Sequence, residues 1–215
     1  MERKTVIEVD RVHKKFKNTE VLKGVTLRCE SGKIYGLVGY NGSGKTVLLK
    51  CICGFLNYEE GEIRINEKKL GRELTMLPSA GIIIEEPSFL RRWDAYHNLK
   101  FLYTICNQND KAHLCQVLRL VGLDPGSRKP VGKYSLGMKQ RLAIAQAVME
   151  DPDVLILDEP MNGLDKNGIQ QMRELFLDMK RKGKLILLAS HNKEDIDVLC
   201  DEVYEMENGR LERIH

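Results

Sequence analysis

A glycine-rich segment constrains this 215-residue chain more than any other feature. It reads Gly39-Tyr-Asn-Gly-Ser-Gly-Lys-Thr46 and matches the pattern G-x-x-x-x-G-K-[ST]. A short apolar run, Ile34–Val38, precedes it, and a stretch with helical periodicity, Thr46–Cys53, follows it. Glycines let successive backbone N–H groups turn inward around phosphate oxygens, and the start of the helix directs its positive end to the same place. The order strand, loop, helix therefore predicts a phosphate-binding loop in an α/β fold.

Two side chains of this loop have predicted roles beyond those of its backbone. Lys45 would reach the β- and γ-phosphates of a nucleotide, and the Thr46 hydroxyl would occupy one coordination position of Mg²⁺. The residues expected to contact the bound group are Gly39, Tyr40, Asn41, Gly42, Ser43, Gly44, Lys45 and Thr46.

The composition is that of an ordinary globular protein. Hydrophobic residues make up 42% and charged residues 30% of the chain, and the net charge is only +3, from 34 basic and 31 acidic residues. This balance is too mild to indicate a nucleic-acid partner. No apolar run approaches the ~18 residues that a membrane-spanning helix needs, and the start does not resemble a signal peptide. The six cysteines form no CxxC pair and no zinc-binding spacing, which favours reduced thiols and a cytosolic location.

Short apolar runs predict the strands of a mixed sheet. Val154–Leu157 and Leu185–Ala189 are apolar throughout, as strands buried on both faces of a parallel sheet must be. Ile34–Val38 and Ile82–Ile84 are further predicted strands. Four other runs alternate apolar and polar residues, which favours half-exposed antiparallel strands: Val6–Val9, Val25–Cys29, Glu62–Ile65 and Val203–Met206.

Helical periodicity predicts the remaining elements. The predicted helices are Thr46–Cys53, Ala95–Ile105, Lys111–Val121, Gly137–Met149, Gly168–Lys180 and Lys193–Leu199. Residues 87–150 hold no convincing strand, so we expect them to form a helical insertion in an α/β core made of residues 1–86 and 151–215. The chain is predicted to be a single domain with this helical subdomain.

A pair of acids ends the buried run Val154–Leu157. Asp158 and Glu159 would emerge at the carboxyl end of a strand, which is where ligands bind in open α/β sheets. Asp158 can hold Mg²⁺ through water, while Glu159 can orient and deprotonate an attacking water. Acids at a strand end can also be solvated turn residues, but the preceding phosphate loop favours the catalytic interpretation.

A second candidate anion site lies at the start of the predicted helix Gly137–Met149. Ser135 and Gly137 at a helix N-terminus can bind an anion through a hydroxyl and backbone N–H groups. The alternative is that Ser135 only caps the helix. Two anion sites on different subdomains suggest a sandwich, in which the phosphates on the loop of one copy are covered by Ser135 of another.

These segments together resemble the nucleotide-binding subunits of ABC transporters over nearly the whole chain. Gly39–Thr46 matches the Walker A loop of that family and Val154–Pro160 its Walker B strand. The signature motif corresponds to Tyr134–Gln140, the D-loop to Asn162–Asp165 and the switch histidine to His191. The resemblance implies a P-loop NTPase core with a mixed sheet, an N-terminal antiparallel β subdomain, a helical insertion, and ATP with Mg²⁺ as cofactors.

The resemblance also implies roles that spacing alone does not assign. Phe16, 23 residues before Gly39, stands where the family stacks an aromatic ring on adenine. His191 would contact the γ-phosphate and help to hold the attacking water, whereas a lone histidine after a strand would otherwise be a capping or core residue. Asp165 would cross the dimer interface and link the two sites.

Three positions depart from the usual family pattern. Glu85 stands where most members have Gln, and it would still ligate Mg²⁺ or its water while adding negative charge beside the other acids. In the signature motif, Leu136 replaces a common Gly and Met138 a Gln. These departures resemble the subgroup that serves bacitracin-type and lantibiotic exporters and immunity systems.

The family resemblance implies an ATPase that dimerises around two ATP molecules, with an identical or a different cassette, and drives a separate membrane permease from the cytoplasmic side. An ABC-type switch acting on nucleic acid or ribosomes is the alternative, but it would need a long coiled coil, a second cassette or zinc modules. A P-loop small-molecule kinase is a third reading, and Ser135 and His191 argue against it.

The segment Pro87–Asn98 is the predicted permease contact. It combines Phe89, Trp93 and Tyr96 with two arginines, the residue types enriched at interface hot spots. In the family this region receives a coupling helix of the membrane subunit. The alternative is that Phe89 and Trp93 simply pack under the helical subdomain.

Overall fold

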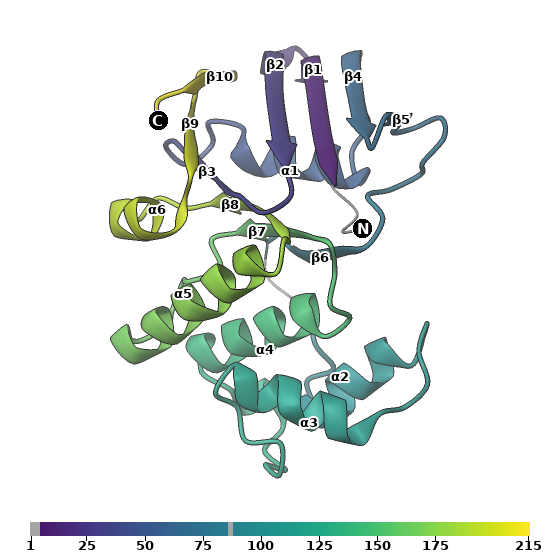
Figure 1. Cartoon of the computed structure of the whole chain (residues 1–215), viewed down its shortest axis with the longest axis vertical. Helices are drawn as coiled ribbons and strands as arrows, with labels where there is room; N and C mark the ends of the chain where they lie inside the picture. Colours follow the sequence, from purple (N-terminus) through teal and green to yellow (C-terminus); the bar gives the residue numbers. More distant parts are fainter. Residues whose placement is uncertain (1–4, 86–87) are drawn as a thin grey trace.

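The computed structural model describes residues 5–85 and 88–215 and arranges them in layers around a central sheet (Figure 1). An antiparallel sheet and one helix lie on one side of the central sheet, and the other helices lie on the opposite side. The N-terminal sheet and the helical segment are therefore separated by the sheet that carries the phosphate loop.

The central sheet has six strands in the order β10-β9-β3-β8-β7-β6. Its parallel part comprises β3 (Ile34–Val38), β8 (Leu185–Ala189), β7 (Val154–Asp158) and β6 (Ala80–Ile83), with β9 (Glu202–Glu207) added parallel to β3. The short strand β10 (Arg210–Arg213) pairs antiparallel with β9 at the edge. Because β3, β8, β7 and β6 run parallel, their carboxyl ends meet at one edge of the sheet.

The apolar strands at the centre of this sheet divide their side chains between two hydrophobic cores. Leu155 and Leu157 of β7 belong to the core beneath the helices, whereas Val154 and Ile156 belong to the core beneath the N-terminal sheet. The side chains of β8 alternate between the two cores in the same way. Continuous apolar runs were predicted for strands covered on both faces, and the structure confirms that prediction.

The second sheet has four strands in the order β2-β1-β4-β5. These are β2 (Thr19–Glu30), β1 (Val6–Phe16), β4 (Glu60–Ile65) and β5 (Lys68–Lys69), all paired antiparallel. Helix α1 (Lys45–Cys53) lies between this sheet and the central one, and Leu48, Leu49 and Ile52 are fully buried there. This arrangement holds the start of α1 at the central sheet's edge.

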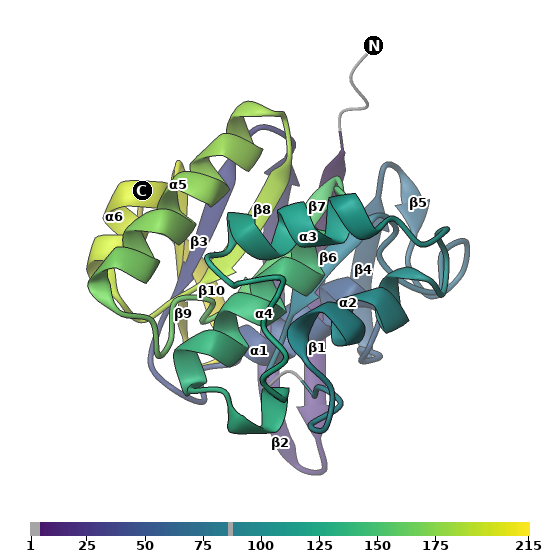
Figure 2. The same cartoon turned by 90° about the horizontal axis from the view of Figure 1, so that it is seen from below.

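The segment after β6 is helical. It contains α2 (Ala95–Tyr103), α3 (Lys111–Leu120), the 3₁₀ turn η1 (Val131–Lys133) and α4 (Leu136–Val148). Helices α5 (Lys166–Arg181) and α6 (Lys193–Leu199) follow β7 and β8 and cover the same side of the sheet (Figure 2). Helix α4 packs against the sheet, and α2 and α3 pack on α4 through residues such as Leu99 and Leu114.

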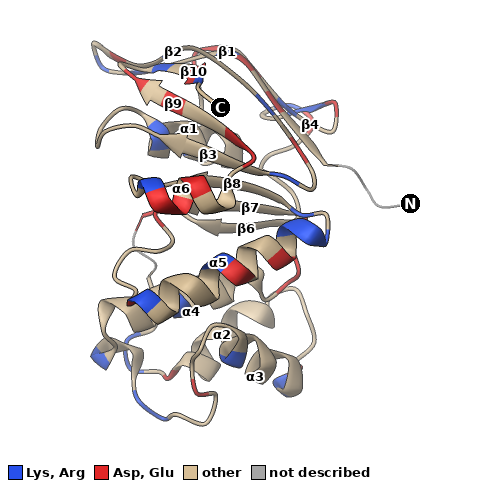
Figure 3. Ribbon diagram, turned by 60° about the vertical axis from the view of Figure 1, so that its left-hand side comes forward, with Lys and Arg blue, Asp and Glu red and all other residues tan. Residues whose placement is uncertain are grey.

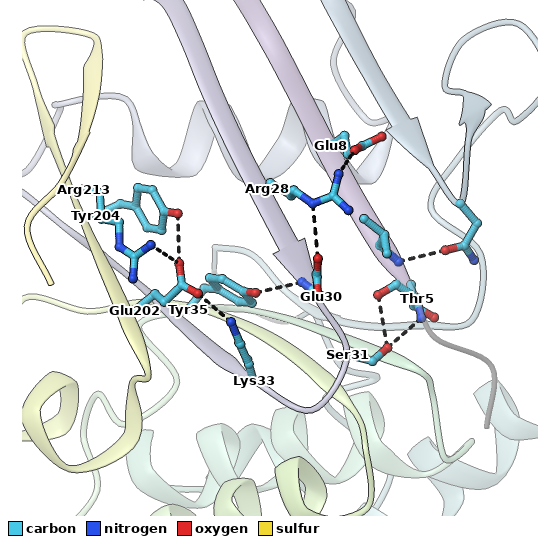
Figure 4. A network of polar contacts seen from close by, with 12 residues as sticks. Thr5, Glu8, Arg28, Glu30, Ser31, Lys33, Tyr35, Glu202, Tyr204 and Arg213 are labelled. Carbon is cyan, nitrogen blue, oxygen red and sulfur yellow. Dashed lines mark hydrogen bonds and ion pairs between the residues drawn. The ribbon is translucent and has the colours of Figure 1, made fainter. Parts of the chain in front are cut away.

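A polar network joins the bases of the two sheets (Figure 4). The carboxylate of Glu202 accepts hydrogen bonds from Lys33 Nζ at 2.8 Å and Tyr204 Oη at 3.2 Å, and Arg213 lies 3.2 Å away. The hydroxyl of Tyr35 accepts a hydrogen bond from the last backbone N–H of β2. The Lys33 hydrogen bond lowers the pKa of Glu202, and burial raises the pKa of Tyr204 to about 12. The network connects the start of β3 to the start of β9 and to the end of β2.

Several predicted elements need correction. Strands β1 and β2 are much longer than the predicted runs Val6–Val9 and Val25–Cys29, because their backbone pairing continues past these runs through register shifts. The run Val203–Met206 was predicted to be antiparallel, but β9 is parallel to β3 and antiparallel only to β10. Alternating apolar and polar residues indicate that one face of a strand is exposed, but not the direction in which the strand runs. In β9 the exposed face results from its position near the edge of the sheet.

Free cysteines are found at all six positions. Cys29, Cys51 and Cys53 are buried, whereas Cys106 is exposed. Burial raises the pKa of the Cys53 thiol to about 12, so it stays protonated. In the described parts of the chain, no helix is long and apolar enough to cross a membrane.

Candidate functional site

A cavity of about 970 Å³ lies where the parallel strands end. The phosphate loop follows β3, the two acids follow β7, and Glu85 follows β6, so all reach the same edge of the sheet. The cavity is lined by Val21, Asn41, Gly42, Gly44, Lys45, Thr46, Val47, Glu85, Ser88, Phe89, Arg91, Val131, Gly132, Leu136, Lys139, Gln140, Asp158, Glu159 and Asn162. Loop, acids and the start of the signature helix are thus brought together.

The phosphate loop wraps closely around the start of α1. Gly39 has a φ of +142°, and a Cβ there would lie 2.4 Å from the carbonyl oxygen of Met206, so only glycine fits. The ammonium of Lys45 donates to the carbonyl oxygens of Gly39 at 2.6 Å and Tyr40 at 3.1 Å. Ser43 Oγ is buried and has no hydrogen-bond partner among the described residues. An orphaned hydroxyl inside a loop of inward-facing N–H groups fits a phosphate oxygen as its partner.

Thr46 and Asp158 form the oxygen pair expected for a magnesium site. Thr46 Oγ1 donates to Asp158 Oδ2 at 2.6 Å, from the first turn of α1 to the end of β7. No group of three or more His, Cys, Asp or Glu side chains suited to a metal occurs within residues 5–85 and 88–215. Mg²⁺ is usually bound through one or two carboxylates and fills most of its other positions with phosphate oxygens and water, so a hydroxyl beside a carboxylate suits it.

Glu159 and His191 face each other across the ends of β7 and β8. His191 Nδ1 lies 2.8 Å from Glu159 Oε1. Glu159 has a φ of +51°, a left-handed conformation that costs about 1–2 kcal/mol for a residue with a Cβ. Its backbone N–H donates to the carbonyl of Ala189 at 2.9 Å, which anchors the strained residue to β8. Such strain is typical of functional positions because the surrounding structure must maintain it.

Glu85 is paired with a cation that the sequence did not point to. Lys50 Nζ, one turn beyond the phosphate loop on α1, donates to Glu85 Oε1 at 2.5 Å. Glu85 also has a positive φ, +61°, and it lines the cavity with Asp158. The ammonium of Lys50 therefore offsets the negative charge that Glu85 adds beside the other acids.

The signature segment begins α4 in close contact with the D-loop. Ser135 Oγ accepts a hydrogen bond from the backbone N–H of Met138 at 3.3 Å, so it caps the helix. A Cβ on Gly137 would lie 2.6 Å from the carbonyl oxygen of Gly163, which excludes any larger residue. Leu136 packs over Gly163 and lines the cavity. Leu136 therefore covers the turn of the D-loop at Gly163.

Several predicted residues do not line the cavity: Phe16, Gly39, Tyr40, Ser43, Ser135, Gly137, Asp165 and His191. Phe16, at the end of β1, is 45% exposed, and Lys14 Nζ lies 5.2 Å from its ring centroid. Asp165 caps α5 by accepting from the backbone N–H of Gly168 at 2.9 Å. Tyr40 is also exposed. Their contacts with nucleotide or with a second cassette stay predictions.

The segment predicted to contact a permease divides into a packed part and an exposed part. Phe89 and Tyr96 pack against the helical core, whereas Trp93 is exposed and stacks edge-on with Phe101 at 5.8 Å between ring centroids. The alternative of simple packing thus holds for Phe89 but not for Trp93. Pro87, the first residue of that segment, lies outside the described residues.

Comparison with known proteins decides the family of this chain. Residues 22–162 match the family model described as ABC transporter. The chain belongs to the ABC transporter family of ATP-binding proteins. An uncharacterized ABC transporter ATP-binding protein of Bacillus subtilis is 44% identical over 96% of this chain and 95% of its own length. The bacitracin transport ATP-binding protein of Enterococcus faecalis is 36% identical, over 96% and 68%, and the lantibiotic transport ATP-binding protein of Streptococcus pyogenes 34% identical, over 96% and 89%.

Solved structures confirm the predicted fold. The ATP-binding subunit of an ABC transporter superposes with a TM-score of 0.86 at 28% identity, over 97% of this chain and 90% of that one. A dimeric bacterial ABC transporter cassette has the same TM-score at 21% identity, over 97% and 99%, and shows the fold alone. The predicted P-loop core with a mixed sheet, an antiparallel N-terminal sheet and helices is therefore that of an ABC cassette.

Sequence reasoning missed several residues of this ABC cassette's site. Lys50 pairs with Glu85, and Gln140 Nε2 lies 3.5 Å from the carbonyl oxygen of Glu159. Tyr40 donates its hydroxyl hydrogen to Asn208 Oδ1 at 3.0 Å, which ties the phosphate loop to the β9–β10 turn. Gln140 was within the signature match and could have been singled out as a buried polar residue. The partners of Glu85 and Tyr40 leave no local sequence signal.

Proposed function

We propose that this chain hydrolyses ATP and uses the energy to drive a separate membrane permease. The observation that carries the proposal is the contact between His191 and Glu159, which lies at the end of β7 beside the phosphate loop. Membership of the ABC family supports ATP as the nucleotide. The chain would form a single domain. Its α/β core would comprise residues 1–86 and 151–215, and residues 87–150 would form its helical subdomain.

Each residue of the site has a proposed part in hydrolysis. Glu159 orients a water molecule and accepts its proton, and a carboxylate at the end of a buried strand is suited to this role. His191 holds the carboxylate of Glu159 in place and contacts the γ-phosphate. Lys45 leaves the loop carbonyls to bind the phosphates, and its charge offsets the charge that develops on them.

The metal would be held by Thr46, Asp158 and Glu85. Their oxygens match the preference of Mg²⁺ for hard ligands, and the 2.6 Å contact between Thr46 and Asp158 already brings two of them together. Bound there, Mg²⁺ would neutralise the negative charge of the phosphates. Lys50 would keep Glu85 oriented toward the site.

Adenine would stack on Phe16, whose ring is exposed at the end of β1. Lys14 covers part of the ring and also donates to Glu59 at 2.7 Å, a hydrogen bond that lowers the pKa of Glu59. A ring held by a cation on one side presents its other side to a base.

Hydrolysis would require two cassettes, identical or different. Ser135 is exposed, and while it caps α4 with its oxygen, its hydroxyl hydrogen remains available to a phosphate of the opposite cassette. Gly137, which has no side chain, would let the phosphates of the opposite cassette approach the start of α4. Asp165 would cross the interface between the two cassettes. The dimeric ABC cassette of the same fold supports this arrangement.

The permease contact is proposed for the exposed part of residues 88–98. Arg91 lines the cavity, and its carbonyl accepts from the N–H of Gly132 at 2.8 Å, three residues before Ser135. Trp93 accepts through its carbonyl from Val131 N–H at 2.8 Å. Because this segment is bonded to the one that leads into the signature helix, a permease bound to it would respond to closure of the site.

The transported compound is proposed to be a peptide antibiotic or a similar molecule, moved outward. Relatives named for bacitracin and lantibiotic transport, 36% and 34% identical over nearly the whole chain, support this class. The cassette would then lie on the cytoplasmic side of the cell membrane, held there by its permease.

Purification from the native host tests the proposal. We expect Mg²⁺-dependent ATP hydrolysis and copurification of a membrane protein. Copurification of nucleic acid or ribosomes instead, with no membrane protein, would favour the alternative of a non-transport ATPase switch.

A further inference from the structure

A buried guanidinium joins the helix that follows the D-loop to the helix that follows His191. Arg173 of α5 donates to Asp195 Oδ1 of α6 through Nε at 2.9 Å and Nη2 at 2.6 Å. Its third nitrogen, Nη1, donates to Glu194 Oε1 at 2.9 Å. The side chains of Arg173 and Asp195 are only 8% and 2% exposed. Buried charges are retained only when they are paired, so this contact fixes the separation of the two helices.

Helix α6 depends on such contacts because it is short. It spans only Lys193–Leu199, and a helix of this length does not hold its conformation alone. Asp195 lies in its first turn, four residues after His191. Ile196 and Leu199 lie on the same side of α6 as Asp195 and are also buried. The position of α6 therefore sets the position of the residues that lead into it.

His191 needs this support because its own contact with Glu159 is weak. The His191 side chain is 63% exposed and that of Glu159 is 22% exposed, so water competes for the hydrogen bond between them. Exposed pairs of this kind contribute little to their own geometry. The backbone on both sides of His191 must hold the ring. Before it, Ser190 N–H donates to Leu37, and after it comes α6.

Helices α5 and α6 lie side by side on one face of the sheet, and acidic residues mark the ribbon of α6 (Figure 3). A second ion pair joins α5 to the residues after α6, because Lys180 Nζ donates to Asp201 Oδ1 at 2.5 Å. That pair is farther from the site and partly exposed, with side chains 27% and 31% accessible. It is a matched comparison for the Arg173 contact.

We propose that Arg173 is a positioning residue for His191, acting through Asp195 and the first turn of α6. This inference rests on the proposed role of His191 and Glu159 in ATP hydrolysis. Arg173 touches neither nucleotide nor water. Arg173 holds the backbone that follows His191, so that the imidazole stays at the carboxylate of Glu159. Because Arg173 projects from α5, it also connects the position of His191 to the D-loop.

Substitution Arg173→Lys tests the proposal, because lysine keeps the charge but cannot reproduce the forked contact. We expect kcat for ATP to fall about 10-fold or more, toward the roughly 100-fold that a misplacement of about 1 Å can cost, while KM for ATP stays near the wild-type value. Thermal unfolding would verify that the variant is folded. Asp195→Asn is the second variant, with the same expectation, should Arg173→Lys fail to fold.

A double-mutant cycle separates positioning from a general structural effect. In a His191→Ala background, Arg173→Lys should lower kcat no further, because the residue that it positions is gone. Lys180→Met, which removes the ion pair with Asp201, and Glu194→Gln, which removes only the charge of the exposed partner of Arg173, should leave kcat near wild type.

The outcomes distinguish this inference from the proposed function. An active wild-type protein whose Arg173→Lys variant has an unchanged kcat, or whose two substitutions reduce kcat independently, would overturn the positioning role alone. A wild-type protein without ATPase activity, assembled with its permease, would overturn the proposed function itself.

Discussion

Nδ1 of His191 lies 2.8 Å from Oε1 of Glu159, although the two residues leave different strands of the central sheet. The contact depends on the parallel pairing of β7 with β8, in which Asp158 is the register partner of Ala189. It places an imidazole against the carboxylate proposed to activate water. This contact with a neighbouring strand distinguishes His191 from a histidine that only caps its own strand.

Replacement of Glu159 by Gln should separate binding from hydrolysis. Gln keeps the shape but cannot accept the proton from water, so we expect kcat to fall about 10²–10⁴-fold with ATP binding retained. The variant should accumulate as an ATP-bound dimer, detectable by size-exclusion chromatography. Glu174→Gln, an exposed acid of α5, is the control. Near-normal turnover of the Glu159 variant would remove this residue from the mechanism.

Lys45→Ala and Ser135→Arg should affect different steps. Loss of the Lys45 ammonium removes a charge-assisted contact to the phosphates, so nucleotide affinity itself should fall by at least about 10-fold. Ser135→Arg should leave binding by the isolated cassette intact and prevent ATP-induced dimers. Equilibrium binding and size-exclusion chromatography measure the two effects. An equal loss of monomer affinity in both variants would contradict the arrangement in which Ser135 serves the opposite cassette.

Glu85→Gln should raise the Mg²⁺ concentration that ATP hydrolysis requires. The substitution removes a negative ligand and leaves the Lys50 ammonium, now 2.5 Å from that carboxylate, without its charged partner. We expect the Mg²⁺ concentration for half-maximal ATPase activity to rise up to about five-fold, the size of effect typical of an exposed charge. An unchanged magnesium titration would place Glu85 outside the metal site.

Arg91→Glu combined with Arg92→Glu should uncouple the cassette from the permease proposed for it. Both arginines are exposed beside Trp93. Reversing their charge should weaken the binding of a partner that recognises aromatic and cationic groups. We expect pull-down of the permease to drop at least about 10-fold while ATP binding persists. The control with the same charge change is Lys111→Glu with Arg119→Glu on α3. Equal recovery by both double variants would place the contact elsewhere.

Stability on the acid side should depend on Glu202. Its pKa is lowered in the folded protein, chiefly by the hydrogen bond from Lys33, so its contribution is present above the unfolded pKa near 4.5 and is lost as the pH falls through the folded pKa. At pH 7 we expect Glu202→Gln to reduce the free energy of unfolding by about 1–3 kcal/mol, with a smaller difference from wild type in strong acid. Denaturant unfolding at several pH values measures this. Glu205→Gln, on the exposed side of the same strand, should show neither effect.

The elements whose chemistry is local could be predicted from the sequence. The phosphate loop needs consecutive backbone N–H groups at the start of a helix, so its spacing is visible in eight adjacent residues, Gly39–Thr46. The buried strand before Asp158 was evident because a strand covered on both faces must be apolar throughout, and the structure divides Val154 and Leu155 between two cores. The helical segment between β6 and β7 followed from periodicity in the same way.

Which distant residues meet could be seen only in the folded chain. Lys50 reaches Glu85, Arg173 reaches Asp195, and Tyr40 reaches Asn208, and none of these pairs follows a spacing that a helix or strand imposes. Each depends on the order and register of strands that pair only after the chain has folded, and β9, whose alternation suggested an antiparallel strand, shows how weakly local pattern constrains that order. A motif specifies backbone conformation over a few residues, whereas a contact between elements is specified by how their buried faces pack.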